Sequence, residues 1–568
     1  MTRTLIRGGT LVDGTGAAPR LAELLIEADR IVDLLDPGAA PPDGAGRVIE
    51  ATGRVVCPGF IDIHSHGDLI HALPPGEQRA LMAGRISQGI TTEIVGNCGM
   101  GVFPRTDHSE GALRGVAAWM TPAAIPGGDP GMWPWSDLES YLSHLEANGL
   151  HVNVGTLQPH GPLRIEAAGL DRDLPGTAGA EGISMMSRRL EAALDAGAFG
   201  LSTGLIYPPG IYARTSEIIE LARVLGRRCA GTALVASHIR GSSETLLPAV
   251  EELLEVGRAA GVRVQHSHSE AVGPDHWAAI DRVLEMEEAG RRSGVAVAFD
   301  MFPYTAAATM MLAIYPPWAL QGGVDRLLAR LADPATRDDI RDAIEKTVPS
   351  WPPWGEGGWP HNLVKAVGWD RITVGSVGPG ANRGAEGMSL RELGRARGAS
   401  PFDAVSDLMM EERGAVSQII HGISGSEDHQ EGIETLLAHP AGAICTDAND
   451  FGKGKPHPAA YGTCPLVLSR WVRERRLLTI EVAVHKMTGY PATLLGLPDR
   501  GVVRRGAFAD LVVFDPATIG TGAGFGSPRV TARGIDLVLI NGAIAFASGA
   551  SGEIAGEPSG RVLRRGGG

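Results

Sequence analysis

Residues 55–68 read VVCPGFIDIHSHGD, an apolar run that ends in two histidines. Its length, its β-branched residues and the polar residues that follow it predict a buried β-strand. His64 and His66 lie two residues apart, so both side chains leave the same face of an extended segment. A pair of imidazoles placed in this way can bind one metal ion. Two histidines that only make hydrogen bonds in a loop would give the same short pattern.

Seven further runs of this kind follow along the chain, and helical stretches separate several of them. They are TTEIVGNCG (91–99), VNVGTLQPHG (152–161), AFGLSTGLIY (198–207), ALVASHIRG (233–241), VRVQHSHSE (262–270), VAVAFDMFPY (295–304) and AGAICTDAND (441–450). Strands that alternate with helices are typical of βα units around a parallel sheet. Eight units predict an α/β fold of the (β/α)₈ barrel type, in which chemistry collects at the carboxyl ends of the strands.

Residues able to bind a metal stand at the ends of five of these eight runs. They are His64, His66, Cys98, His238, His268 and Asp447. Neutral imidazoles together with a thiolate suit zinc, and a zinc site that keeps an open position for water is catalytic. Zinc lowers the pKa of a bound water to about 7 and polarises a carbonyl oxygen, which is the chemistry of metal-assisted hydrolysis.

Asp447, in the sequence CTDAND, is the candidate for proton transfer. A carboxylate beside the water can take its proton and return it to the leaving group, so we expect a general base that becomes a general acid. Asn449 and Asp450 compete for the assignment, and an aspartate that caps a turn is the structural alternative. His266 lies two residues before His268 on the same strand face and could replace it as a ligand.

The composition limits the classes of protein. The 568 residues carry a formal charge of −14, from 51 basic and 65 acidic side chains, which argues against nucleic acid or an anionic membrane as a partner. The five cysteines show no CxxC spacing, so a disulfide framework or a structural zinc finger is not expected. No apolar stretch is long enough to span a membrane. We expect a cytoplasmic protein, and a homo-oligomer is compatible with this composition.

Both ends of the chain show short strand-like runs broken by turn residues. This texture predicts one small all-β unit made from residues 1–57 and 499–568, with the barrel over residues 58–498. Residues 305–440, between the seventh and eighth runs, are far more than one crossover connection needs. We expect the Trp- and Pro-rich part of this segment, about residues 305–370, to be an inserted lid over the site.

GFIDIHSHGD, the histidines of the fifth and sixth runs and the aspartate of the eighth together resemble the amidohydrolase superfamily. More closely, the chain resembles the N-acyl-D-amino-acid deacylases, or D-aminoacylases, through GNCG, GLSTGLIYPPG, SHIRG, FPYTA, HPAAYGT, MTGYPATLLGL and RGVVRRGAFADLVVFDP. The resemblance runs from about residue 4 to residue 565. It implies a barrel flanked by a β-sandwich from both termini, with a mobile lid inserted late.

Lysine usage supports the same subfamily. In many amidohydrolases a carboxylated lysine on the fourth strand bridges two metals, but here that run reads GLSTGL and no lysine precedes Lys346. In D-aminoacylases a cysteine on the second strand supplies the ligand, and Cys98 matches its position. The resemblance implies a tightly held zinc on Cys98, His238 and His268. It also implies a second, weaker site in which His64 and His66 share the Cys98 thiolate.

The resemblance further implies three substrate-binding residues, which are Tyr207 of GLIYPPG, Arg240 of SHIRG and Tyr304 of FPYTA. The Tyr207 phenol would donate to the scissile carbonyl oxygen as charge develops there. Each residue has a structural alternative, since both tyrosines can be loop aromatics and Arg240 can pair with a neighbouring acid.

Three positions depart from the family pattern. The usual His-Pro-Arg is His457-Pro458-Ala459 here, Glu270 replaces the lysine after the sixth-run histidine, and Cys464 replaces a phenylalanine. A guanidinium can hold a carboxylate through two hydrogen bonds, which alanine cannot do. The substrate is therefore expected to lack a free α-carboxylate, or to have it bound by Arg240 or another arginine. The preference for D or L substrates stays open.

These observations predict zinc-dependent hydrolysis of a linear amide in a small molecule, either an N-acyl-D-amino acid or a related N-acyl amine. The alternative enzyme is a cyclic amidase or lactonase on the same barrel, acting on an imide, a hydantoin-like ring or an ester. A barrel that has lost catalysis and acts as a scaffold is a third interpretation. Its weakness is that Cys98, His238, His268 and Asp447 are all present.

Overall fold

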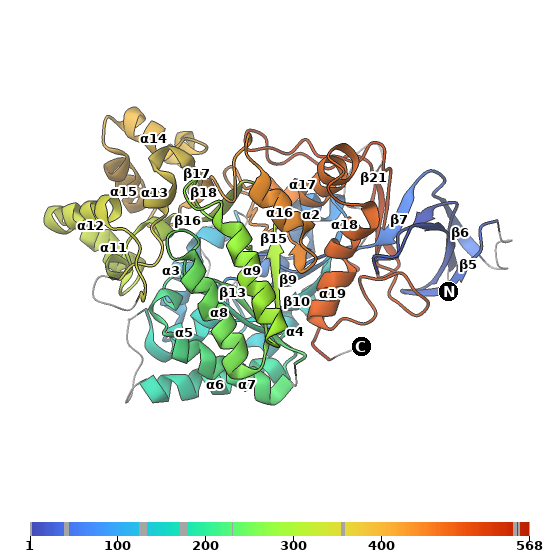
Figure 1. Ribbon diagram of the computed structural model, residues 1–568, viewed down its shortest axis with the longest axis horizontal. Coiled ribbons are helices and arrows are strands. Elements are labelled where there is room, and N and C mark those ends of the chain that lie inside the picture. Colours follow the sequence, from blue (N-terminus) through green and yellow to red (C-terminus); the bar gives the residue numbers. More distant parts are fainter. Residues whose placement is uncertain are drawn as a thin grey trace.

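The computed structural model describes residues 3–38, 45–123, 133–170, 179–229, 231–353, 358–548, 554 and 557–566. A closed ring of parallel strands lies at its centre (Figure 1). In order around the ring these are β8 (Phe60–Asp62), β9 (Ile90–Val95), β10 (Asn153–Thr156) with its short continuation β11 (Gln158–Pro159), β12 (Gly200–Gly204), β13 (Leu234–His238), β14 (Arg263–His266), β15 (Val297–Met301) and β19 (Gly442–Ile444). A parallel bridge between Ser65 and Ala448 closes the ring. The expected (β/α)₈ barrel is confirmed, and each strand overlaps its predicted run.

Helices surround the barrel and bury one apolar face each. They are α2 (Pro75–Ser87), α4 (Leu138–Asn148), α5 (His160–Ala168), α6 (Ala180–Asp195), α7 (Thr215–Cys229), α8 (Leu246–Ala260), α9 (Ala279–Arg292), α16 (Glu431–Ala438), α18 (Ile480–Met487) and α19 (Gly489–Leu495). In α8, Val250 and Leu254 are buried four residues apart while Glu251 and Glu255 face solvent, as an amphipathic helix requires. Within the described ranges no helix is long and apolar enough to cross a membrane.

Two further sheets lie at one end of the molecule, and the second of them joins strands from both ends of the chain (Figure 1). One has the order β5 (Arg30–Leu35), β4 (Glu23–Glu27), β1 (Arg3–Arg7), β6 (Ala45–Glu50). The other has the order β22 (Ala543–Ala547), β21 (Ile535–Ile540), β20 (Leu511–Phe514), β7 (Val55–Pro58), β2 (Thr10–Leu11), β3 (Arg20–Leu21). Ile6 and Leu24 of the first sheet and Val56 and Leu511 of the second lie in one apolar cluster, so the sheets pack face to face.

The run VVCPGFIDIHSH forms two strands rather than the single strand predicted from its apolar pattern. β7 belongs to the terminal sheet and β8 to the barrel, and Gly59 separates them. A Cβ atom at Gly59 would lie 2.2 Å from Thr91 Oγ1, so only glycine fits where the chain passes from one sheet to the other. An apolar pattern reports burial of both strands and contains no signal that they are buried in different sheets.

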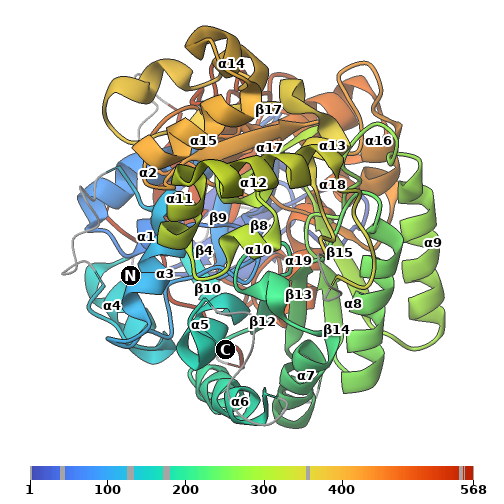
Figure 2. The same ribbon diagram turned by 90° about the vertical axis from the view of Figure 1, so that its left-hand side faces the viewer.

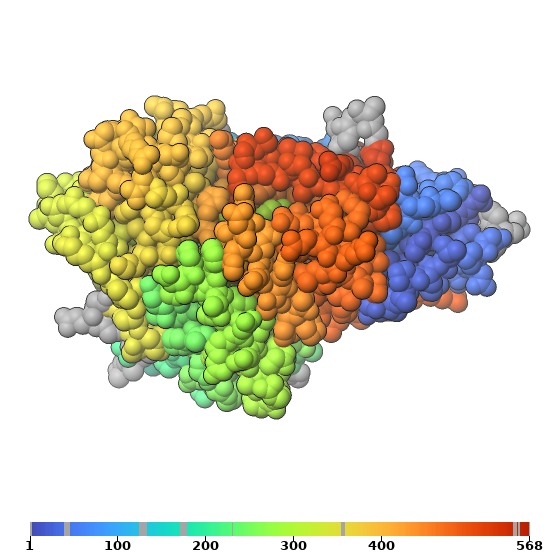
Figure 3. Space-filling view, turned by 45° about the horizontal axis from the view of Figure 1, so that its top comes forward, coloured from blue at the N-terminus to red at the C-terminus, as the bar shows by residue number. Residues whose placement is uncertain are grey.

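The segment between β15 and β19 builds a unit of its own at the opposite end of the molecule from the blue N-terminal strands (Figures 1 and 3). Its antiparallel sheet has the order β16 (Ala306–Met310), β18 (Ser417–His421), β17 (Ile372–Ser376). Its helices are α10 (Pro317–Leu320), α11 (Val324–Ala332), α12 (Pro334–Lys346), α13 (Leu363–Val367), α14 (Leu390–Arg397) and α15 (Pro401–Glu411). In Figure 2, α10, α11 and α12 lie in front of the barrel strands.

This unit extends past residue 370, the expected end of the insertion, because β16 completes its sheet by pairing with β18. That pairing joins residues more than a hundred positions apart in the chain, and local sequence patterns do not report such contacts. The movement of this segment as a lid stays a prediction.

Candidate metal centre

The barrel strands place the candidate ligands at one edge of the ring. His64 and His66 follow β8, His238 is the last residue of β13, and Asp447 follows β19. Cys98, His268 and Asp447 have positive φ angles of 52°, 36° and 49°. Non-glycine residues adopt this left-handed conformation uncommonly, and such residues cluster at functional sites because it turns a side chain sharply inward.

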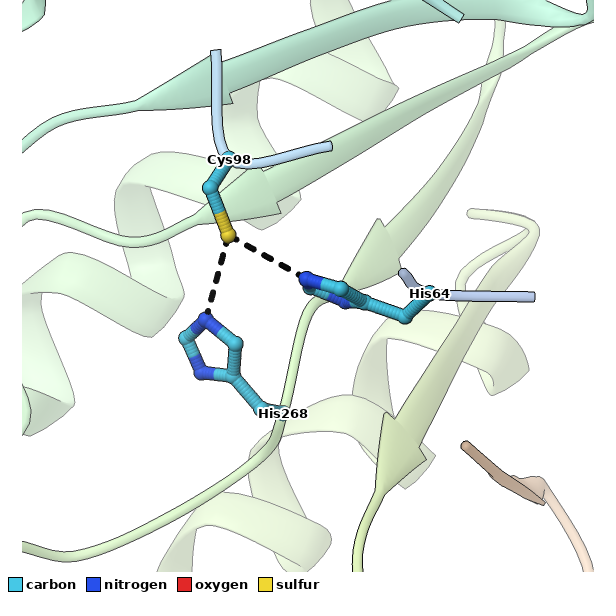
Figure 4. Close-up of side chains that lie close together, drawn as sticks. All are labelled: His64, Cys98 and His268. Atoms are coloured by element: carbon cyan, nitrogen blue, oxygen red, sulfur yellow. Dashed lines mark hydrogen bonds between the residues drawn. The ribbon is translucent and has the colours of Figure 1, made fainter. Parts of the chain in front are cut away.

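Cys98 lies between two histidines. Its Sγ is 3.2 Å from His64 Nε2 and 3.5 Å from His268 Nε2 (Figure 4). All three side chains are buried. Their ligand atoms lie within 4.8 Å of one another, close enough to bind one metal ion. The structure thus brings together three residues that follow separate strands, and their role as ligands stays a prediction.

A second group overlaps the first through His64. Asp447 Oδ1 lies 3.2 Å from His66 Nε2 and 3.6 Å from His64 Nε2. His238 is outside both groups but adjacent to them, since its ring centroid is 4.4 Å from that of His268. The predicted ligands therefore form one continuous cluster with Cys98 near its middle.

The electrostatics of the cluster favour a thiolate. Burial raises the pKa of the Cys98 thiol, but His64 and His268 outweigh burial and hold that pKa well below its ordinary value. Burial likewise raises the pKa of the Asp447 carboxyl, and His64 and His66 hold it below 3.8. Burial together with the neighbouring His268 lowers the pKa of His238 to about 4, so His238 is a neutral imidazole. A thiolate, a carboxylate and a neutral imidazole are the protonation states that bind zinc.

Asp300, the fourth residue of β15, fixes the orientation of His64. Its Oδ1 accepts a hydrogen bond from His64 Nδ1 at 3.2 Å and another from the backbone N–H of His268 at 2.7 Å. With its Nδ1 held by Asp300, His64 points its Nε2 toward Cys98, the orientation in which this nitrogen would bind a metal ion. The sequence analysis did not assign Asp300, although a carboxylate in the otherwise apolar run VAVAFDMF was a usable signal.

A pocket opens beside the cluster. Its walls come from the barrel and from the inserted unit, and its lining residues are His66, Cys98, Met100, Trp119, Ile206, Tyr207, His238, His268, Glu270, Val272, Ala307, Ala308, Thr309, His361, Leu363, Ile420, Ile423 and Asp447. The contribution of β16, α13 and β18 could not be read from the sequence, since it depends on how the inserted unit packs.

Tyr207 lies in this pocket. Its ring packs 4.9 Å from the His238 ring, and its phenol oxygen accepts a hydrogen bond from Thr309 Oγ1 at 2.8 Å. Burial and the nearby Cys98 raise the pKa of the phenol well above 10, so Tyr207 keeps its proton. With the Thr309 hydroxyl as its donor, the phenol has its own hydrogen available for a substrate oxygen.

Arg240 and Tyr304 are not among the residues that line the pocket. Arg240 is fully buried and forms a bidentate pair with Glu252 of α8, with Nε 3.0 Å from Oε2 and Nη2 2.9 Å from Oε1. Tyr304 packs against His457, with ring centroids 5.0 Å apart. The structure therefore does not bring these two expected substrate residues into contact with the pocket.

The competing assignments also separate in space. His266 Nδ1 is 2.9 Å from Glu287 Oε1 on α9, so His266 faces a helix while His268 faces Cys98. Asp450 forms an ion pair with Arg529 at 2.7 Å. Of the acids in CTDAND, Asp447 is thus the one placed beside the histidines.

Comparison with known proteins agrees with this geometry. A model of the amidohydrolase family matches residues 47–546. N-acyl-D-glutamate deacylase of Alcaligenes xylosoxydans xylosoxydans is 33% identical over 566 residues, covering 99% of this chain and 96% of that protein. The crystal structure of N-acyl-D-glutamate deacylase from Bordetella bronchiseptica, complexed with zinc and a phosphonate inhibitor that mimics the tetrahedral intermediate, has 31% identity and a TM-score of 0.76 over 99% of both chains. A D-aminoacylase structure with a binuclear metal centre has 30% identity and a TM-score of 0.76, also over 99% of both chains.

Proposed function

The chain belongs to the amidohydrolase family and is a hydrolase of carbon–nitrogen bonds other than peptide bonds, and we propose that it uses zinc to hydrolyse the linear amide of an N-acylated small molecule. The class includes N-acyl-D-amino acids and related N-acyl amines, because full-length relatives are N-acyl-D-glutamate deacylase, N-acyl-D-aspartate deacylase and D-aminoacylase. The observation that carries the proposal is the position of the Cys98 sulfur between two imidazoles, inside a pocket that Asp447 also lines.

The donor set fits zinc. A buried thiolate with imidazole nitrogens at 3.2 and 3.5 Å is a soft, nitrogen- and sulfur-rich site of the kind zinc prefers. His238 Nδ1 is buried without a hydrogen-bond partner among the described residues. Buried polar atoms without partners are rare, and a bound cation would satisfy them.

Cys98, His238 and His268 would hold the tight zinc ion, and His64 and His66 would hold a second, weaker one that shares the Cys98 thiolate. The contacts of Cys98 with both His64 and His268 support a shared thiolate. Zinc bound here would supply Lewis acidity to polarise the scissile carbonyl and acidify a water.

The chain's own residues complete the reaction. Asp447, held as a carboxylate by His64 and His66, takes a proton from the attacking water on its Oδ1 side and delivers it to the leaving nitrogen. The Tyr207 phenol donates a hydrogen bond to the carbonyl oxygen as negative charge develops there. The apolar walls of the pocket exclude bulk water around both groups.

The organisation expected from the sequence belongs to the same proposal. The barrel over residues 58–498 carries the site, residues 1–57 and 499–568 form the β-sandwich, and the insertion covers the pocket as a lid. We place the enzyme in the cytoplasm as a protein whose partner is its small-molecule substrate. All five cysteines are free and buried, which suits a reducing compartment.

The test is an acetate-release or amine-release assay on protein stripped of metal and reloaded with zinc. The panel contains N-acyl-D-amino acids, N-acyl-L-amino acids, carboxylate-free amides and cyclic amides. Loss of activity on stripping, recovery with zinc, and loss in Asp447→Asn and Cys98→Ala support the proposal. Cys229→Ala, at the end of α7 and outside the pocket, is the matched control that keeps activity. Turnover of cyclic amides alone, or activity near that of the unmodified enzyme in both site variants, would contradict it.

A further inference from the structure

Among the described residues, the lining of the pocket beside the metal cluster contains acidic side chains but no arginine or lysine. Opposite the candidate ligands its wall is apolar and comes mainly from Met100, Trp119, Ile206, Val272, Leu363 and Ile420. Within the part of the chain that the structure describes, no arginine or lysine lines it. The two carboxylates in the lining are Asp447 and Glu270.

Glu270 has one oxygen without a partner. The residue is 7% exposed, and its Oε1 lies 3.8 Å from His268 Nδ1, beyond hydrogen-bond distance. Its Oε2 is buried and accepts no hydrogen bond from any described residue. A buried carboxylate oxygen without a donor is costly, so a donor is expected from whatever fills the pocket.

The remaining polar groups of the wall are neutral donors. The backbone N–H of Ser242 lies 3.4 Å from His361 Nδ1, so this nitrogen accepts and the ring proton sits on Nε2. Burial lowers the pKa of His361 to about 3, which keeps the imidazole uncharged at neutral pH. Trp119 Nε1 is a second neutral donor, and it has no hydrogen-bond partner among the described residues. Neutral donors suit carbonyl oxygens of a substrate but do not balance the charge of a carboxylate.

Arg240 cannot supply a positive charge to a substrate carboxylate in this pocket. Arg240 follows His238 by two residues, yet Glu252 already neutralises it through a buried bidentate pair. A carboxylate in the pocket would therefore find no arginine or lysine to pair with among the described residues, while Glu270 and Asp447 belong to the same lining.

We propose that the enzyme selects N-acylated amines that carry no free carboxylate, and that Glu270 is the specificity-determining residue, accepting a hydrogen bond from an N–H donor of the substrate in a pocket whose described residues offer no arginine or lysine to a carboxylate. The inference rests on the proposed function. Hydrolysis adds one water across the carbon–nitrogen bond, so the products are a carboxylic acid and an amine, and the amine product carries the donor group. A site discriminates between two substrates both by the contacts that it makes with one and by the polar groups of the other that it leaves without a partner.

The test compares two substrates of nearly equal size, N-acetyl-D-phenylalaninamide and N-acetyl-D-phenylalanine, by acetate release from zinc-loaded enzyme. The L enantiomers are run in parallel. We expect kcat/KM to be about tenfold or more higher for the amide, because the described lining of the pocket offers the carboxylate no arginine or lysine in place of the water that it loses on binding. Glu270→Gln should shrink this ratio and Glu270→Lys should reverse it. Glu285→Gln on the exposed face of α9, where the side chain is 65% exposed, is the matched control that leaves the ratio unchanged. The zinc content of every variant is measured.

Two results would overturn the inference while leaving the proposed function standing. One is a higher kcat/KM for the carboxylate in the unmodified enzyme, and the other is an unchanged ratio in both Glu270 variants. If neither compound is hydrolysed, amide hydrolysis itself fails, and calorimetric titration of the zinc-loaded protein decides the inference separately. Tighter binding of D-phenylalaninamide than of D-phenylalanine supports it, and equal or weaker binding refutes it.

Discussion

Asp300 offers a sharp test of how the metal centre is built. Its carboxylate accepts hydrogen bonds from His64 Nδ1 at 3.2 Å and from the backbone N–H of His268 at 2.7 Å. Asp300 is not among the residues that line the pocket. Asp300→Asn keeps the size of the side chain and removes its charge. Both contacts then lose the negative charge of their acceptor, so His64 is held less firmly with its Nε2 pointing toward Cys98.

The magnitude follows from the change in that bond. A hydrogen bond to a charged group contributes about 1.5–3 kcal/mol and a neutral one about 1 kcal/mol. The difference of about 1.4 kcal/mol corresponds to about tenfold weaker zinc binding. This lies at the lower end of the effects measured when residues that orient metal ligands are replaced.

The chain supplies a matched control. Glu287 makes the same kind of buried contact with His266, at 2.9 Å, but His266 lies outside the ligand cluster. Zinc affinity is measured for Asp300→Asn and Glu287→Gln by competition with a chromophoric chelator, and the melting temperature of the metal-free proteins reports any general loss of stability. We expect both variants to melt lower and only Asp300→Asn to bind zinc more weakly. Equal zinc affinity in the two variants would refute the reasoning.

Three further changes test the site, the pH dependence and the packing. Tyr207→Phe should lower kcat by about 10²–10³-fold with little change in KM, because it removes a donor to the developing oxyanion; a change confined to KM would exclude that role. Burial raises the pKa of Glu217, but its partner His160 outweighs burial and holds that pKa below 4.5, so this stabilisation is present above about pH 4.5 and is lost as the pH falls through the lowered pKa. Glu217→Gln should therefore flatten the acid side of a plot of unfolding free energy against pH, and an unchanged slope would contradict it. Gly59→Ala, which brings a Cβ to 2.2 Å from Thr91 Oγ1, should cost about 1–3 kcal/mol of unfolding free energy in urea titration, and unaltered stability would show that this crossing is less tightly packed than the structure indicates.

The barrel and most of its ligand cluster are predictable from sequence because their signals are local. A strand that ends in His238 or Cys98 is recognised within ten residues, and barrel geometry brings strand ends together. The absence of lysine before Lys346 argued against a carboxylated-lysine bridge, and the resemblance to D-aminoacylases then implied Cys98 as the ligand.

The unpredicted part of the site depends on partners that are distant in the chain. Arg240 is neutralised by Glu252, which the periodicity of α8 identifies only as one of several acids on that helix. Asp300 reaches His64 across 236 positions of sequence. The walls contributed by His361 and Ile420 depend on the packing of the inserted unit. In each case the residue type is visible in the sequence, while its contact is decided by tertiary structure.

The passage of the chain through Gly59 also sets an order of events during protein synthesis. β7 is bonded on one side to β2, which has already been translated, and on the other to β20, whose residues Leu511–Phe514 leave the ribosome near the end of the chain. One edge of β7, the strand immediately before β8 and His64, therefore remains unpaired while the barrel is being translated. Chains that end before Leu511 would carry every residue of the ligand cluster and still leave β7 with one unpaired edge, so nascent or truncated chains should depend on chaperones until the last strands are made.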